Sequence, residues 1–333
     1  MKVFVSGAAG FLGSHIADAF IRTGNEVAGC DNMIGGDLVN LPEGISFEIA
    51  DCGDVATMKR LTRGADLIYH CAAVAPEGFS VFSPALVAKH VYENTAGLLA
   101  AAATNRTRRF VYCSSMARYG AGTPPFTEEQ PVQPETPYAI AKCAAELLVA
   151  NVCDTHGLEF VIAVPHNIVG PKQKYDDPYR NVVSIFVNRM LQGLQPIIYG
   201  DGEQRRSFSF IQDCVEPLVR MATLPGLNGE IINIGPDENP ISINELAEHL
   251  AKLIGFKLDP IRVGARPREV RVATCSAEKA RRLLGYKTSV TLDQGLRTMA
   301  EWIRSHGVKP FVYHLPIEID SPLLPSTWRD RLI

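Results

Sequence analysis

The sequence lacks long apolar runs and any surplus of positive charge. No apolar stretch approaches the roughly 18 residues that a membrane-spanning helix needs. Its 333 residues carry a formal net charge of -3, whereas nucleic-acid-binding domains usually show a basic surplus. The chain starts directly with the pattern of a strand instead of the layout of a signal peptide. We therefore expect a cytoplasmic globular protein with no membrane and no nucleic-acid partner.

The cysteines lack the spacing of a metal site. All eight stand singly, and no two of them form a C-x-x-C pair. Several lie inside apolar strands, which is typical of buried thiols and not of zinc ligands or disulfides. The sequence thus predicts no metal ion.

What the sequence does contain is a glycine-rich turn at its start. An apolar strand over 2–6 leads into the turn, and a helix follows. Gly7 permits a tight turn, Gly10 lets the backbone approach a pyrophosphate, and Gly13 lets helix and strand pack closely. The amide groups and the positive end of the helix dipole favour an anion there. This order predicts a dinucleotide site that includes Gly7, Gly10, Phe11, Leu12 and Gly13.

Strands and helices alternate up to about residue 165. Further apolar strands are expected at 26–30, 46–50, 67–71, 109–113 and 159–164. Helices are expected at 14–23, 56–61, 87–105 and 138–155. Such alternation predicts an α/β fold, a Rossmann-type doubly wound parallel sheet with helices on both faces.

Beyond residue 165 the pattern loosens. Helices are expected at 182–193, 243–253 and 277–284. We divide the chain into an NAD-binding Rossmann domain, 1–165, and a smaller C-terminal α/β substrate lobe, 166–333. The lobe is expected over the carboxyl edge of the sheet, where ligands bind in such folds. A strand or helix near 208–235 is a candidate to return to the first domain.

The end of the second strand indicates which dinucleotide binds. Asp31 stands 18 residues after Gly13. A carboxylate at this place accepts hydrogen bonds from the adenosine ribose and repels a 2′-phosphate, so NAD is favoured over NADP. The alternative is that Asp31 serves only as a turn-forming residue before Asn32.

Two later strand ends are placed to contact the same cofactor, because the carboxyl ends of parallel strands share one edge of the sheet. Asp51 and Cys52 follow the third strand and are placed to touch the adenine. Cys71, Ala72 and Ala73 follow the fourth strand, and their small side chains leave room for the cofactor.

Catalytic chemistry is indicated by Tyr138 and Lys142. Residues four apart share one face of a helix, so the phenol and the ammonium group can share a site. Lowering a tyrosine pKa from near 10 towards 7 takes about 4 kcal/mol, which a lysine and a positive nicotinamide ring can supply. Tyr138 would then be a general base towards an alcohol, and Ser115 could hydrogen-bond the same oxygen. The alternative is an ordinary tyrosine and lysine on an amphipathic helix.

With these motifs the chain resembles the extended short-chain dehydrogenase/reductases, in particular the nucleotide-sugar epimerases and dehydratases. The resemblance covers nearly the whole chain. It rests on Gly7-x-x-Gly10-x-x-Gly13, His70-Cys-Ala-Ala73, Asn94-x-x-Gly97, Ser114-Ser115, Tyr138-x-x-x-Lys142, Val164-Pro-His-Asn167-x-x-Gly170-Pro171, Tyr199-Gly-Asp-Gly-Glu-Gln-Arg-Arg206-Ser-Phe208, Asn233-Ile-Gly235, Arg266-Pro267 and Lys279-Ala-Arg-Arg-Leu-Leu-Gly285.

The resemblance implies roles for particular residues. It implies catalysis by Ser115, Tyr138 and Lys142. It implies NAD as cofactor, with Asn32, Asn94, Tyr138, Lys142 and Pro165 added to its contacts. The implied partner is a nucleotide-sugar substrate, held by Ser115, Met116, Asn167, Arg206 and Arg266. An arginine fork pairs bidentately with phosphate, although a solvated surface charge is the alternative for each arginine. A homodimer built on helices 87–105 and 138–155 is also implied.

The reaction stays open between an epimerase and a dehydratase. The 4,6-dehydratases that the chain resembles place an Asp-Glu pair directly after the catalytic hydroxyl, whereas Met116 and Ala117 stand here and cannot transfer protons. A 4-epimerase needs no further acid or base. We therefore expect an NAD-dependent NDP-sugar 4-epimerase acting through a transient 4-keto intermediate, with a UDP-hexose as first choice of substrate. The alternatives are an NDP-sugar dehydratase or C4 dehydrogenase that yields a 4-keto or unsaturated sugar, and a non-catalytic NAD sensor or lipid or steroid reductase.

Three places depart from the pattern of such relatives. Arg118 stands where an aliphatic residue is expected. Glu77 lies in the loop 75–82, where it could act as a base if it reached the sugar, although an exposed carboxylate is the simpler expectation. Pro165 and His166 replace an arginine-containing strand end, and a histidine beside a proline is more often structural than catalytic.

Overall fold

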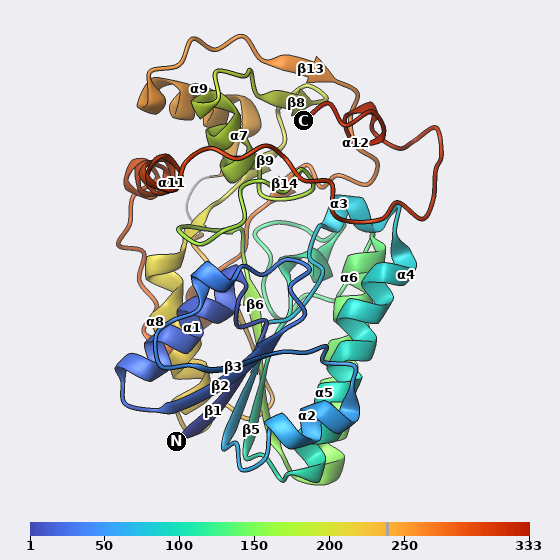
Figure 1. Ribbon diagram of the computed structural model, residues 1–333, viewed down its shortest axis with the longest axis vertical. Helices are drawn as coiled ribbons and strands as arrows, with labels where there is room; N and C mark the ends of the chain where they lie inside the picture. Colours follow the sequence, from blue (N-terminus) through green and yellow to red (C-terminus); the bar gives the residue numbers. More distant parts are fainter. Residues whose placement is uncertain (238–239) are drawn as a thin grey trace.

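A seven-stranded parallel sheet organises the molecule (Figure 1). The computed structural model describes residues 1–237 and 240–333. Every neighbouring pair of strands in this sheet is parallel. Across the sheet the strands are β11 (Glu230–Ile234), β6 (Glu159–Pro165), β5 (Arg109–Cys113), β4 (Leu67–His70), β1 (Lys2–Ser6), β2 (Glu26–Asp31) and β3 (Ser46–Ile49). The predicted doubly wound α/β fold is confirmed.

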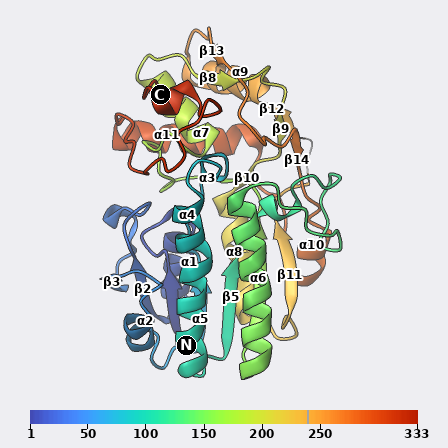
Figure 2. The same cartoon turned by 90° about the vertical axis from the view of Figure 1, so that its right-hand side faces the viewer.

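Helices cover both faces of the sheet because successive strand residues point to opposite sides. Val3 and Val5 pack with α1 (Phe11–Arg22) and α8 (Ile211–Thr223). Phe4 lies in the other layer, with α2 (Val55–Leu61), α5 (Asn94–Thr104) and α6 (Pro137–His156). Figures 1 and 2 show these two layers on either side of the strands.

Two of these helices show how local sequence sets their bounds. α6 begins at Pro137, and the Thr136 side chain accepts a hydrogen bond from the Ala139 amide. It ends at His156, and the cap residue Gly157 adopts the left-handed conformation that favours glycine. The helix predicted at 87–105 is a longer helical run that starts at α4 (Pro84–Val87), continues through a π-helical segment, η2 (Ala88–Glu93), and ends with α5.

A second lobe lies over the carboxyl edge of the sheet (Figure 1). Its core joins Phe186, Leu246 and Met299, which come from α7 (Val182–Leu191), α9 (Ile243–Ile254) and α11 (Leu292–His306). Short strands complete it: β7 (Ile168–Val169), β8 (Ile197–Tyr199), β9 (Arg205–Arg206), β10 (Ser209–Phe210), β12 (Ile241–Ser242), β13 (Ile261–Val263) and β14 (Val272–Ala273).

Helix α11 is absent from the sequence expectations. Its buried residues Leu296, Met299, Ala300 and Ile303 have helical spacing, and a capping box at Thr291 marks its start. The helical spacing and the capping box are both visible in the sequence, so this helix could have been predicted.

The chain returns to the first domain after entering the second lobe. β11 pairs with β6 in the sheet, and α8 packs beside α1, so elements of 208–235 join the first domain. α10 (Glu278–Leu284) also returns, because Ala280 and Leu284 belong to the core cluster of α1 and α8. Residues 166–333 therefore do not form one continuous lobe.

The segment 307–333 closes over the edge of the second layer. It contains α12 (Ser326–Arg329), whose buried Trp328 ring contacts the rings of Phe79 and Phe82. The Glu318 carboxylate accepts hydrogen bonds from the amides of Ala85 and Leu86 at 2.8 Å each. These contacts fix α3 (Glu77–Ser80) and the start of α4.

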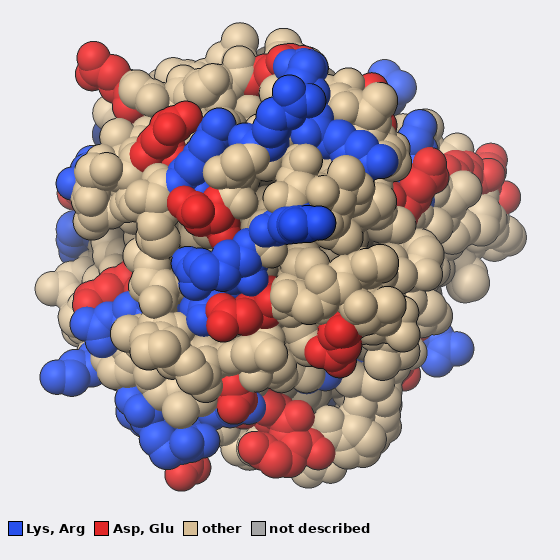
Figure 3. Space-filling view, turned by 90° about the horizontal axis from the view of Figure 1, so that it is seen from below, with Lys and Arg blue, Asp and Glu red and all other residues tan. Residues whose placement is uncertain are grey.

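The surface shows no large region of one charge sign in the view of Figure 3, where acidic and basic side chains are interspersed. Within residues 1–237 and 240–333, no helix is long and apolar enough to cross a membrane. No group of three or more His, Cys, Asp or Glu side chains among the described residues is arranged to hold a metal ion. All eight cysteines are free thiols, and all but Cys71 are buried.

Candidate functional site

Two adjoining cavities lie at the carboxyl end of the sheet. The cofactor cavity, of about 280 Å³, is lined by the glycine turn and the ends of β2, β4 and β5. The substrate cavity, of about 330 Å³, lies between the first domain and the second lobe. The cavities meet at residues that line both of them: Ala75, Ser115, Tyr138, Pro165, Asn167, Ile168, Arg180 and Asn181.

Nearly all predicted site residues fall into these cavities. The cofactor cavity is lined by Gly7, Gly10, Phe11, Leu12, Gly13, Asp31, Asn32, Cys52, Cys71, Ala72, Ala73, Asn94, Tyr138, Lys142 and Pro165. The substrate cavity is lined by Ser115, Met116, Asn167, Arg206 and Arg266.

Asp51 is the predicted site residue that does not line the cofactor cavity. Its carboxylate accepts hydrogen bonds from the Asn32 side chain at 3.0 Å and from the Gly53 amide at 2.9 Å. These two bonds hold the carboxylate beside Asn32 and Cys52, which do line the cavity. The expected contact of Asp51 to the adenine stays a prediction.

The glycine turn has the shape that a pyrophosphate requires. Gly7 has a φ of +71°, and a Cβ there would lie 2.8 Å from the amide nitrogen of Ala72. A Cβ on Gly13 would collide with the Gly7 carbonyl oxygen. Gly10 caps α1 without a side chain, and no acidic residue stands in the first turn. The helix N-terminus is therefore open to an anion, and these residues fit NAD.

Asp31 both forms a turn and lines the cofactor cavity. Its Oδ1 accepts a hydrogen bond from the Met33 amide at 2.8 Å, and Gly36 lies so close that a Cβ there would be 2.8 Å from the carboxylate. Burial raises the pKa of Asp31, and backbone hydrogen bonds oppose this shift. The two roles considered for Asp31 are compatible, because one oxygen serves the turn.

Tyr138, Ser115 and Lys142 lie where the two cavities meet. The Tyr138 hydroxyl is hydrogen-bonded to the Ser115 side chain. Lys142 Nζ donates to the Cys113 carbonyl oxygen at 2.7 Å and lies 5.9 Å from the centroid of the Tyr138 ring. Burial raises the pKa of Tyr138, and the Ser115 hydrogen bond opposes that shift. Arg180 also lowers the pKa of Tyr138, whereas Glu77 raises it. The lowering expected from Lys142 together with a positive nicotinamide ring stays a prediction for the NAD-bound protein.

Arg118 belongs to a buried network behind this site. Its guanidinium lies 3.0 Å from a carboxylate oxygen of Glu146, and Ser114 Oγ donates to the other oxygen. Glu146 lies on α6 one turn after Lys142. An aliphatic residue at 118 would leave this carboxylate buried without its cation, which is strongly destabilising. Arg118 is thus the partner that Glu146 requires.

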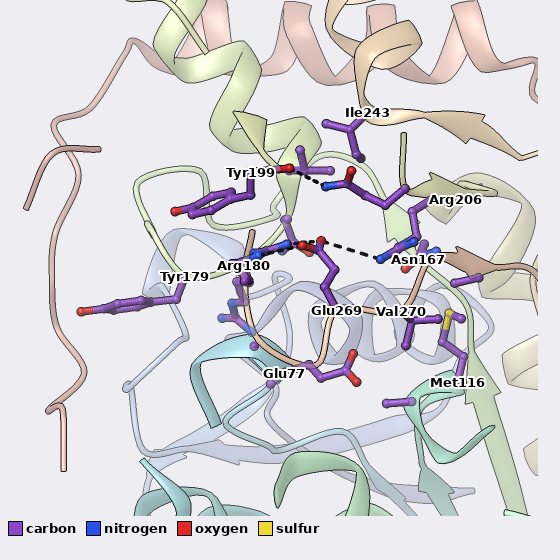
Figure 4. A pocket seen from close by; sticks show the side chains of 18 of the residues that line it. Glu77, Met116, Asn167, Tyr179, Arg180, Tyr199, Arg206, Ile243, Glu269 and Val270 are labelled. Carbon is purple, nitrogen blue, oxygen red and sulfur yellow. Dashed lines mark hydrogen bonds and ion pairs between the residues drawn. The ribbon is translucent and has the colours of Figure 1, made fainter. Parts of the chain in front are cut away.

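The substrate cavity is lined by cations from the second lobe (Figure 4). Arg266 pairs with Glu269 at 2.6 Å, and its guanidinium lies 4.7 Å from the centroid of the Tyr199 ring. Arg206 lies 3.8 Å from the same carboxylate. Asn167 donates to the Ser207 carbonyl at 3.0 Å. Two clustered guanidinium groups suit a diphosphate.

Glu77 and His166, which depart from the pattern of similar proteins, lie in different surroundings. Glu77 lines the substrate cavity, so the expectation of an exposed loop carboxylate is wrong; α3 turns it inward and the segment 307–333 covers α3. His166 is fully buried and lines neither cavity, and burial lowers its pKa to about 3. A neutral, enclosed imidazole agrees with the structural role expected for His166.

The sequence expectations missed three cavity residues of the second lobe. Arg180 lines both cavities and pairs with Asp177 at 3.1 Å. Tyr199 and Glu269 hold Arg266 in place. Tyr199 begins a motif quoted above, which was a usable signal. Arg180 lies in an irregular loop between β7 and α7, where no periodicity points to a site.

The fold and the site define a Rossmann-type, dinucleotide-dependent enzyme. Its Tyr-Lys pair lines the cofactor cavity, and Tyr138 also lines a second, arginine-lined cavity. A match to the NAD dependent epimerase/dehydratase family covers residues 3–235. The chain therefore belongs to the NAD-dependent epimerase/dehydratase family, and its cofactor is NAD.

Individual relatives cover nearly the whole chain. UDP-glucose 4-epimerase of Mycolicibacterium smegmatis is 31% identical over 92% of this chain and 99% of its own length. dTDP-glucose 4,6-dehydratase of Streptomyces niveus is also 31% identical, over 92% of this chain and 94% of its own. A crystal structure of UDP-glucose 4-epimerase with UDP-glucose, from Thermotoga maritima, has a TM-score of 0.87 and 29% identity, covering 92% and 99% of the two chains. By sequence identity the chain is thus as similar to an isomerase as to a lyase.

Lys142→Met tests how burial acts on the ammonium group. Burial lowers the pKa of Lys142 to about 8 from 10.5. Between these two pKa values the unfolded chain binds more protons than the folded protein does. The free energy of unfolding of the wild type therefore rises with pH in this range. We expect the variant to lose activity. We also expect the melting temperature of the variant minus that of the wild type to be highest near pH 7 and to fall towards pH 10, because only the wild type is stabilised by the rise in pH. Thermal unfolding at both pH values measures this.

Lys287→Met, at an exposed position, is the matched control and should show no such trend. If Lys142→Met is less stable than wild type by the same amount at both pH values, the hydrogen bond to Cys113, and not charge burial, dominates at this position.

Proposed function

We propose that this chain is an NAD-dependent nucleotide-sugar 4-epimerase whose first-choice substrate is a UDP-hexose. The observation that carries the proposal is the junction of the two cavities. Tyr138 and Ser115 lie there, between the glycine turn and the paired arginines, and Met116 and Ala117 supply no acid or base after the serine. The family supports an epimerase or a dehydratase, and the side chains present favour the epimerase.

The second lobe would hold the nucleoside diphosphate. Arg206 and Arg266 present guanidinium groups to the substrate cavity, and Glu269 keeps both in a fixed arrangement. Fixed arginines bind phosphate oxygens at a lower entropic cost than mobile ones. Gly7, Gly10 and the N-terminus of α1 would hold the cofactor pyrophosphate, and Asp31 the adenosine ribose.

The residues at the junction perform the proton transfers. Bound NAD would accept a hydride from C4 of the sugar and return it. Tyr138 takes the proton of the C4 hydroxyl and gives it back, acting as general base and then as general acid. Ser115 donates to the same oxygen and aligns it. Lys142 holds the end of β5 through the Cys113 carbonyl and places a positive charge near the phenol.

Return of the hydride to the opposite face requires the 4-keto sugar to turn within the cavity. A cavity of about 330 Å³ lies at the lower end of the usual range for ligand sites. The diphosphate can stay on the arginines while the ring turns about its linkage. No group besides those named is needed, and the product differs from the substrate only at C4.

A panel of UDP-, GDP- and dTDP-hexoses tests this proposal. We expect purified protein with NAD to convert at least one UDP-hexose into an isomer of identical mass, detected by chromatography with mass spectrometry. A product lighter by one water would identify a dehydratase. A product lighter by two hydrogens, with accumulated NADH, would identify a C4 dehydrogenase.

Tyr138→Phe is the matched variant for this assay. It keeps the ring and removes the hydroxyl, and we expect turnover to fall about 10²–10⁴-fold, the usual scale for a general acid–base. NAD binding should persist, because the glycine turn is untouched. Near-normal turnover would exclude Tyr138 as the proton-transfer residue.

We further propose that the protein is a homodimer formed through α6 and the helical run of α4, η2 and α5. These helices lie side by side on one flank of the molecule (Figure 2). Ile140 and Leu147, seven residues apart on α6, are 54% and 75% exposed, and Tyr92 on η2 is 41% exposed. Apolar side chains gathered on adjacent helices are typical of a covered face.

Leu147→Asp should shift the protein from dimer to monomer, because burial of an unpaired carboxylate at an apolar contact has a large free-energy cost. Size-exclusion chromatography with light scattering measures the mass in solution. Leu323→Asp, at another exposed apolar position, should leave the mass unchanged. A wild-type protein that is monomeric at all concentrations contradicts the proposed dimer.

A further inference from the structure

We propose that Glu77 is a second acid–base residue, which exchanges a proton with the sugar carbon next to the C4 ketone. This inference rests on the proposed function, because the ketone arises in the epimerase cycle. It adds a proton transfer at carbon to the transfer at oxygen that Tyr138 performs.

The position of Glu77 supports this role. It is the first residue of α3 and lines the substrate cavity together with Ser115, Met116 and Tyr138. Figure 4 shows its carboxylate extending into the cavity towards Met116. Met116 has no group that can transfer a proton, and Glu77 therefore supplies the carboxylate on this side of the cavity.

Glu77 also has no cation bound to it. No ion pair within 4 Å involves Glu77 in the described part of the chain, whereas Glu269 holds both Arg206 and Arg266. Its recorded side-chain hydrogen bond, from Thr136 Oγ1 at 3.5 Å, is long and weak. Burial raises the pKa of Glu77 and the nearby arginines only partly oppose this shift. Such a carboxyl group holds a proton more readily than an exposed one, and no bound cation fixes it in the charged form, which suits it to exchange a proton with a substrate.

The backbone keeps Glu77 and Tyr138 in a fixed relation. Ser80 Oγ donates to the Glu77 carbonyl at 2.5 Å and accepts from the Tyr138 amide at 3.2 Å. One hydroxyl group therefore links the two residues. Trp328 packs on Phe79, so the segment 307–333 holds α3 against α6. A group held this firmly is suited to proton transfer, because transfer requires a fixed donor–acceptor distance.

The chemical step is balanced without any further reagent. A ketone at C4 makes the C–H bonds at C3 and C5 acidic. The Glu77 carboxylate takes one of these protons, the C–H electron pair forms a double bond to C4, and the carbonyl pair moves to the oxygen as an enolate. Ser115 and Tyr138 donate hydrogen bonds to that oxygen. The Glu77 carboxyl group then exchanges its proton with a solvent water molecule. Return of a proton from Glu77 to the carbon restores the ketone, with solvent hydrogen in place of the original.

The experiment supplies the ketone directly, so that it does not depend on oxidation at C4. The holoenzyme is incubated with a UDP-4-ketohexose in D₂O, and deuterium at C3 and C5 is followed by NMR against a sample without protein. We expect wild type to accelerate exchange at one of these carbons. Glu77→Gln should reduce the accelerated rate about 10²-fold or more, the scale of a lost general base, and Glu77→Asp should restore part of it.

Glu129→Gln, at an exposed position, is the matched control and should exchange like wild type. Exchange no faster than without protein, or equal rates in wild type and Glu77→Gln, would overturn the role of Glu77. The panel of UDP-hexoses reports separately on the epimerase. A protein that fails the panel yet deuterates the supplied ketone in a Glu77-dependent way would refute the proposed function and retain this inference.

Discussion

The close packing of α1 against the turn after β1 is the constraint on which the rest of the site depends. Gly13 has no side chain and therefore lies against the Gly7 carbonyl, and Gly7 lies against the backbone of Ala72. These contacts bring the ends of β1 and β4 and the start of α1 into one small region. An added Cβ at any of the tight positions would separate them. At the glycine turn the wall of the cofactor cavity is therefore formed by backbone and not by side chains.

The opposite wall is built from α6 and depends on buried charge. Tyr138, Lys142 and Glu146 follow one another at one-turn spacing, and each is tied to β5 or to the residues after it: Ser115, the Cys113 carbonyl, and Ser114. Arg118 compensates the innermost carboxylate. A buried ion pair rarely adds net stability, and its effect here is to fix how α6 lies along the strand that carries the serine.

Local patterns predicted the parts of the protein that local geometry determines. The glycine turn, Asp31 and the Tyr138–Lys142 pair follow from the shape of a turn and the pitch of a helix, and the structure brings all of them to one cavity. Their roles stay predictions. Glu77 could not be predicted as a cavity residue, because its burial depends on contacts between α3 and residues near Trp328, about 250 positions later in the chain. The position of Asp51 at a strand end could not reveal its internal hydrogen bonds to Asn32 and Gly53, because these depend on how the following loop folds.

The path of the chain between the lobes has a consequence for how such a protein changes its substrate. The sheet takes strand β11 after the chain has visited the second lobe, and α10 returns once more before α11 leaves again. No single cut separates the first domain from the second lobe. Exchange of a contiguous gene segment after residue 166 would therefore carry part of the sheet with it. Substitutions within the cavity walls leave this shared frame intact.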